Sequence, residues 1–102
     1  MTAPYVYSTE ALQEFKDIVR YTKRQWGKEQ ALRYAEQIEE TAFGLATGKC
    51  FFKELNDVML GLRFAAAGSH YVFCLPRLDQ PAVVLAILHN RMDLITRLKA
   101  RI

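Results

Sequence analysis

The stretch LQEFKDIVRYTKRQWGKEQALRYAEQIEETAFGL, residues 12–45, decides the fold. In its first half, side chains suited to a core recur at intervals of three and four residues, the period of one face of an α-helix. These positions are Leu12, Phe15, Val19, Thr22 and Trp26. The second half repeats the spacing with Ala31, Ala35, Ile38, Ala42 and Leu45. Gly27 lies between the two patterns, where a glycine readily ends a helix. The stretch therefore predicts two helices that pack face to face as an antiparallel hairpin.

Both flanks of this hairpin are rich in residues that favour β-strands. PYVYS, residues 4–8, predicts a short first strand, and Ser8 or Thr9 is placed to cap the following helix. After a loop with a possible plug of Phe51 and Phe52, three apolar runs follow, at residues 58–67, 70–76 and 81–89. Their short connections favour an antiparallel meander. The last run is apolar at every position from 82 to 88, which is typical of a strand covered on both faces.

The chain ends in MDLITRLKARI, where Asp93 can cap a short helix. We therefore predict an α+β protein in the order β-α-α-β-β-β-α, with a helical hairpin packed on a small, mainly antiparallel sheet. A chain of 102 residues is long enough for one core, so residues 1–102 are expected to form a single domain.

Charge is distributed unevenly along the chain. Residues 1–90 contain ten Lys and Arg and ten Asp and Glu, whereas residues 91–102 contain four basic residues and one acidic residue, so the net charge of +3 lies in the last twelve residues. A protein that binds nucleic acid over one whole face would spread its charge. We therefore expect no sequence-specific DNA binding by the chain alone.

Other functional classes lack a signal. No apolar run approaches the roughly 20 residues of a membrane helix, and the N-terminus does not resemble a signal peptide, so we expect a cytoplasmic protein with no membrane contact. Cys50 and Cys74 have no metal-ligand spacing and are expected to be reduced, mostly buried thiols. We predict no metal and no cofactor.

Several short patterns occur in a characteristic order. They are Tyr21–Gly27 with its Trp-Gly end, Gln30, Ala31, Tyr34 and Ile38 in the second helix, Leu62-Arg63, the strand His70–Cys74, and Ile87–Leu98. With these patterns the chain resembles the RelE/ParE toxin superfamily, and within it the ParE-like branch. The resemblance spans residues 4–98.

This resemblance implies the toxin of a type II toxin–antitoxin system. ParE-like members poison DNA gyrase, with the A subunit as the expected target, and are neutralised by a ParD-like antitoxin. Action by binding needs a surface rather than catalytic residues. For the gyrase surface we predict a basic, partly apolar set: Arg91, Leu94, Arg97, Leu98, Lys99 and Arg101. For the antitoxin we predict contacts with Arg63, Phe64, Tyr71 and Trp26.

Two alternatives remain open at this stage. RelE-type members cut mRNA on the ribosome, and a metal-free ribonuclease needs a proton-transfer group together with cations. His89, with Arg63 and Arg91, is the set that this chain offers for such a site. Against it, few cations accompany Arg63, and residues 91–102 contain no tyrosine. The other alternative is an inactive binding module with a ParE-like fold.

Overall fold

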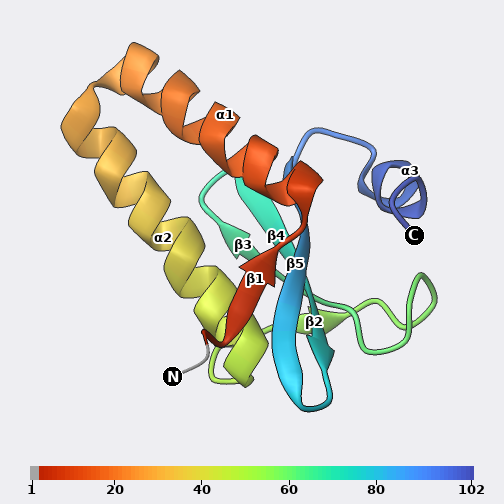
Figure 1. The fold of residues 1–102 in the computed structure, drawn as a ribbon. Coiled ribbons are helices and arrows are strands. Elements are labelled where there is room, and N and C mark those ends of the chain that lie inside the picture. The colour runs from red at the N-terminus through yellow and green to blue at the C-terminus, as the bar shows by residue number, and fades with distance from the viewer. Residues whose placement is uncertain (1–2) are drawn as a thin grey trace.

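The computed structural model describes residues 3–102. A five-stranded sheet carries a helical hairpin on one face and a short helix on the other (Figure 1). The elements in order are β1 (Tyr5–Tyr7), α1 (Thr9–Trp26), α2 (Lys28–Thr47), β2 (Lys53–Glu54), β3 (Arg63–Ala67), β4 (His70–Arg77), β5 (Gln80–His89) and α3 (Leu94–Lys99). The strand order is β1-β5-β4-β3-β2, and only the β1–β5 pair is parallel. The predicted α+β class and element order are confirmed, with β2 as an additional two-residue edge strand.

Helix α2 packs on the sheet as its sequence pattern predicts. Ala31, Ile38, Ala42 and Leu45 are all buried, and Ala35 is partly buried. The turn into α2 consists of Gly27 alone, whose φ of 94° suits a residue without a side chain. Because no longer loop intervenes, α1 and α2 meet at a sharp tip, which extends beyond the sheet (Figure 1).

The predicted core face of α1 is wrong by part of a turn. Leu12 and Trp26 are exposed, whereas the positions that face the core are Ala11, Phe15, Ile18 and Thr22. Ser8 sets this rotation, because its backbone N–H donates to the Val84 carbonyl and its hydroxyl to the Leu85 carbonyl. The same hydroxyl accepts from the Ala11 N–H as the helix cap. The start of α1 is thereby fixed on β5.

Strand β5 is covered on both faces, as predicted. Val84 and Ile87 belong to the core under the hairpin, while Ala86 and Leu88 belong to the core under α3. These residues do not alternate strictly, because the register shifts between the Phe73–Ala86 and Cys74–Val84 pairs. The shift leaves Leu85 as an extra residue, a β-bulge that exchanges the two faces along the strand.

The segment between α2 and β3 differs from prediction. The run expected to be a strand from residue 58 is a turn up to Leu62, since Val58 and Met59 donate to the Leu55 carbonyl. Phe51 is 90% exposed and does not plug the core. Phe52 is partly buried, with the Arg63 guanidinium 4.4 Å from its ring centre. In residues 3–102, no helix is long and apolar enough to cross a membrane.

Candidate functional site

The basic C-terminal segment forms a short helix that closes one face of the sheet. Leu98 of α3 is fully buried, and Leu94 packs beside it against a cluster that includes Phe73 and Leu88. Asp93 caps the helix through hydrogen bonds from the Thr96 N–H and hydroxyl, at 3.3 and 2.8 Å. These bonds hold the pKa of Asp93 below its usual value. The expected capped helix is confirmed, and two leucines fix its orientation.

An ion pair between α1 and the C-terminus fastens α3 to the sheet. The Glu14 carboxylate accepts from both Arg101 guanidinium nitrogens, at 2.9 and 2.6 Å. Both side chains are only about a fifth exposed, at 22% and 18%. The bond to Glu14 raises the pKa of Arg101 further, so this guanidinium stays charged. A two-pronged contact of this kind fixes orientation as well as distance.

The same ion pair completes the hydrogen bonding of β5. Strand β1 pairs with β5 only at residues 82–84, so the backbone of β5 beyond Val84 has no strand partner on that side. The Ile87 N–H donates to Glu14 at 2.9 Å, and the Leu85 carbonyl accepts from Arg101 at 3.1 Å. Because unpaired backbone groups in a partly buried place are costly, Glu14 and Arg101 act together as a clasp over the open strand.

This arrangement divides the predicted gyrase surface in two. Leu98 is inside the core and Arg101 is bound to Glu14, so neither belongs to an exposed contact surface, which corrects the prediction for both. Leu94 is partly buried against the sheet. Arg91, Arg97 and Lys99 are exposed. The exposed apolar neighbours of these cations are Met92 and Ile95, each 42% exposed.

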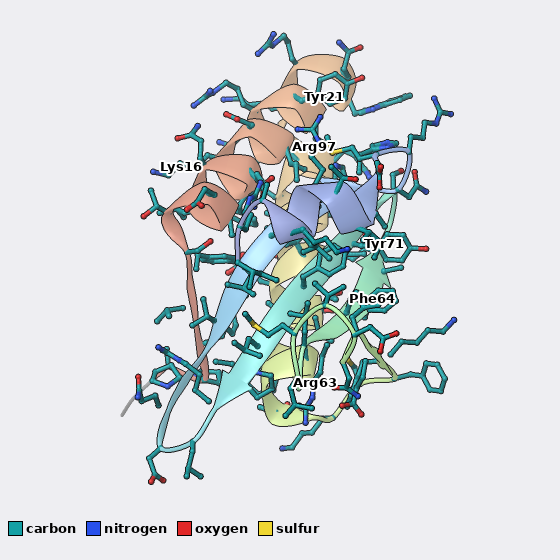
Figure 2. The ribbon with its side chains drawn as sticks, turned by 90° about the vertical axis from the view of Figure 1, so that its right-hand side faces the viewer. Lys16, Tyr21, Arg63, Phe64, Tyr71 and Arg97 are labelled. Carbon is teal, nitrogen blue, oxygen red and sulfur yellow. The ribbon has the colours of Figure 1, made fainter. Side chains whose placement is uncertain are left out.

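The four residues predicted to contact the antitoxin lie in three places. Phe64 and Tyr71 are neighbours on the face that carries α3, with ring centres 5.7 Å apart, and Phe64 also stacks on Phe73 (Figure 2). Arg63 instead turns toward the end of α2 and donates to the Leu45 carbonyl at 2.8 Å, so it is engaged within the chain. Trp26 lies at the hairpin tip. Only Phe64 and Tyr71 therefore form one continuous surface.

A second polar cluster lies at the inner side of the hairpin tip and was not predicted. His70 and His89 are opposite each other in the β4–β5 register, with ring centres 5.2 Å apart. The Tyr34 hydroxyl lies 2.6 Å from Nδ1 of His70 and also bonds Ala67 and Ser69 at the β3–β4 turn. Burial and the neighbouring His89 lower the pKa of His70, and burial raises the pKa of Tyr34. Both groups are therefore neutral near pH 7.

Tyr34 fits this place because Gly68 leaves room for it. A Cβ atom on Gly68 would lie 2.5 Å from the Tyr34 ring, and φ at this glycine is 59°. The hydroxyl of Tyr34 thus reaches the turn backbone directly. An open cavity of about 590 Å³ is lined by Tyr34, Ser69, His70 and His89 together with Tyr21, Thr22, Trp26 and Gln30.

Arg63 does not converge with His89 and Arg91, the other two residues considered for ribonuclease chemistry. Arg63 is the first residue of β3, and Ala67 is the last. Ala67 pairs with His70 of β4, which in turn pairs with His89 of β5, so Arg63 lies at the end of β3 away from His89. Four residues of strand correspond to about 13 Å. Nδ1 of His89 accepts from the Arg91 N–H at 3.1 Å, while Arg63 is bound to α2. His89 therefore has a structural partner in the Arg91 backbone, and Arg63, the other cation proposed to assist it, is far away. Within residues 3–102 no group of three or more His, Cys, Asp and Glu is placed to hold a metal ion.

Comparison with known proteins gives a consistent result. The family model described as "ParE toxin of type II toxin-antitoxin system, parDE" matches residues 5–94. The chain is 47% identical over 102 residues to Toxin ParE of Escherichia coli, covering 100% of this chain and 98% of that protein. It is 31% identical over 90 residues to Toxin ParE1 of Caulobacter vibrioides, covering 88% and 92%. Toxin ParE1 of Mycobacterium tuberculosis is 27% identical over 93 residues, covering 91% and 95%.

Proposed function

Because this chain belongs to the ParE toxin family of type II toxin–antitoxin systems, we propose that it stops bacterial growth by binding DNA gyrase, without catalysis of its own. The observation that carries the proposal is the contrast between the two candidate sites. Arg63, one of the two cations considered for RNA cleavage, lies at the far end of β3 from His89 and is bound to α2, whereas α3 presents a fixed, exposed surface of cations and apolar side chains. The target would be the A subunit, in the cytoplasm.

The outer side of α3 has the composition of a protein-binding surface. Ile95 and Lys99 are one helical turn apart and thus adjacent, whereas Arg97 lies on the opposite flank of the helix. Arg91 and Met92 precede the helix and are also exposed. Arginine with apolar neighbours is the combination that binding surfaces favour, and the cationic charge accelerates approach to a target that holds DNA. The Glu14–Arg101 clasp fixes this surface before binding, which reduces the entropy lost on association.

The antitoxin that neutralises the chain would be ParD-like and would cover the face next to α3. Phe64 and Tyr71 are partly exposed there, and the neighbouring edge strand β2 is only two residues long. An amphipathic segment of the antitoxin would place apolar side chains on these two rings. It would thereby lie beside α3 and restrict access to the gyrase surface.

Induced expression in bacteria tests the target. Gyrase poisoning predicts filamentous cells, an SOS response and DNA breaks that disappear in a host with a resistant gyrase. Immediate arrest of translation with codon-phased mRNA cuts would instead establish ribonuclease action and overturn the proposal. Normal growth at high expression of folded protein would identify an inactive binding module.

A pair of variants tests the surface. Replacing Arg91, Arg97 and Lys99 together with Gln is expected to abolish toxicity, because all three cations are exposed and contribute to target binding. His89→Ala is expected to remain toxic. Retained binding to the antitoxin must show that both variants are folded. Full toxicity of the triple variant would exclude α3 as the gyrase surface.

A further inference from the structure

The tip of the helical hairpin combines features that no part of the proposed function uses. Between Asp17 and Glu29 the chain carries four basic residues and no acidic one: Arg20, Lys23, Arg24 and Lys28. All four are exposed. Two large aromatic side chains are exposed among them, with Tyr21 at 61% and Trp26 at 74%. Exposed tryptophan is uncommon on a surface without a partner.

The two aromatic side chains border the cavity of about 590 Å³ between the tip and the sheet. Tyr21 and Trp26 line it from α1, while Gln30 and Tyr34 line it from α2. Lys23 lies one turn before Trp26, and Arg24 lies one turn after Tyr21, so each aromatic ring has a cation as its helical neighbour. The cavity thus has aromatic walls, and the cations of the hairpin tip occupy neighbouring helix positions, with Arg20 paired to Asp17 at 3.4 Å.

The far side of the cavity offers neutral hydrogen-bonding groups. We assign the single hydrogen of the Tyr34 hydroxyl to the Ala67 carbonyl, so His70 donates from Nδ1 and its Nε2 is an acceptor. Nδ1 of His89 accepts from the Arg91 N–H, which leaves the hydrogen of this ring on Nε2 as a donor. An acceptor, a donor and an amide are the kinds of group that recognise the edge of a nucleobase.

We propose that this cavity, the tip cavity, binds single-stranded nucleic acid, with one base between Tyr21 and Trp26 and the backbone phosphates on the cations of the hairpin tip. Stacking on aromatic rings combined with a cationic track is the general mode of single-strand binding. An acidic protein segment could satisfy the cations, but it would make no use of the neutral donor–acceptor set. The site is separate from α3, and the proposal does not depend on the identity of the toxin's target.

Trp26 is the single tryptophan of the chain, so its fluorescence reports on the site directly. Titration of the full chain with an eight-nucleotide single-stranded DNA is expected to quench this fluorescence to saturation. The logarithm of the binding constant should fall with the logarithm of salt concentration with a slope of about −2 to −3, given about 0.7 per phosphate contact. A duplex of the same sequence should bind more weakly and quench less.

Matched variants separate stacking from charge. With a fluorescein-labelled strand, Trp26→Ala is expected to weaken binding about 5- to 100-fold, and Trp26→Phe to restore most of it. Lys23→Gln with Arg24→Gln should reduce the salt slope by about 1.4. Lys53→Gln, an exposed lysine on edge strand β2, is the control and should leave the slope nearly unchanged.

Three results would overturn the proposal. One is the absence of saturable quenching at low salt. Another is equal affinity of Trp26→Ala and the unchanged chain for the labelled strand. Binding would then be due to nonspecific electrostatic attraction, without stacking on Trp26. The third is loss of antitoxin binding in Trp26→Ala with unchanged oligonucleotide binding, which would make the tip a protein-docking surface. None of these results bears on the gyrase test, which is read from bacterial growth and DNA breaks.

Discussion

The two faces of the sheet are closed by very different amounts of structure. On one face, α1 and α2 contribute 18 and 20 residues and seal a core that includes Ile38, Leu45 and Val84. On the other face, the six residues of α3 contribute one fully buried side chain, Leu98, and leave Phe64 and Tyr71 partly exposed. The first face holds the fold together, while the second is only partly closed.

This difference separates stability from binding. Burial of one leucine and part of another contributes about 2–4 kcal/mol, which the ordering of α3 and its linker largely offsets. Helix α3 thus depends on the Glu14–Arg101 clasp for its position. The hairpin face can keep the chain folded while α3 and its neighbours carry the surfaces that partners contact. The same contrast predicts how substitutions on the two faces differ.

Ile38→Ala is expected to have the largest effect. Ile38 is fully buried under the hairpin, and removal of its side chain leaves a cavity that the two long helices cannot close. We expect a loss of about 3–4 kcal/mol in the free energy of unfolding. Urea denaturation followed by circular dichroism measures it. A loss below about 1 kcal/mol would show that this face is not the main source of stability.

Glu14→Ala is expected to cost about 2–3 kcal/mol. It removes the charge partner of Arg101 and leaves the Ile87 N–H without its acceptor. Glu14→Gln is the matched control, because an amide oxygen can still accept from Ile87 while the charge is lost, and roughly half of the effect should remain. Hydrogen exchange should show faster exchange in α3 for both variants. Unchanged exchange there would contradict the role of the clasp.

Leu98→Ala is expected to cost only about 1–2 kcal/mol, although Leu98 is as deeply buried as Ile38. Its loss cannot exceed the free energy that docks α3, because the helix can detach while the rest remains folded. The denaturation midpoint should therefore move less than for Ile38→Ala. Amide hydrogen exchange should become faster in residues 94–99 and not in the rest of the chain. A loss equal to that of Ile38→Ala would mean that both faces fold as one unit.

Local patterns in the sequence were enough to predict much of the hairpin face and the start of α3. The spacing in α2, the caps at Ser8 and Asp93 and the doubly covered strand β5 all follow from neighbours in the chain. The rotation of α1 did not follow, because Ser8 fixes it through bonds to Val84 and Leu85. The buried face also carries Glu14, three residues after Ala11 and four before Ile18, and an acidic residue is typical of a solvent face unless it has a partner such as Arg101.

The side-chain contacts at the candidate sites depend on the register between strands. That register cannot be predicted from the sequence pattern. A simple two-residue turn between Arg77 and Gln80 would place His70 opposite Ile87, but two register shifts in β4 and β5 place it opposite His89. In the same way, counting charges assigned Arg101 to the exposed basic tail, whereas its partner Glu14 is 87 positions away in the chain. Contacts between distant residues arise from the bulge and the packing, so periodicity alone could not predict them.

His70 gives the smallest expected effect, and it concerns the hairpin face alone. Its pKa in the folded chain is lowered by burial and by His89, although Glu14 opposes the shift, and Tyr34 packs against it from α2. Above the unfolded pKa of about 6.5, His70 is neutral in both the folded and the unfolded chain. In that range it does not make the free energy of unfolding depend on pH. As pH falls below that value, the unfolded chain takes up the proton first, so stability decreases until the folded pKa is passed.

The variant His70→Gln removes this contribution, and its free energy of unfolding should decline less between pH 7 and pH 5 than that of the unchanged chain. Denaturation across this range, with carboxylates common to both proteins, measures the difference. Parallel pH profiles would show that the folded structure accommodates a charged His70, and that the Tyr34–His70–His89 contacts do not require neutral rings.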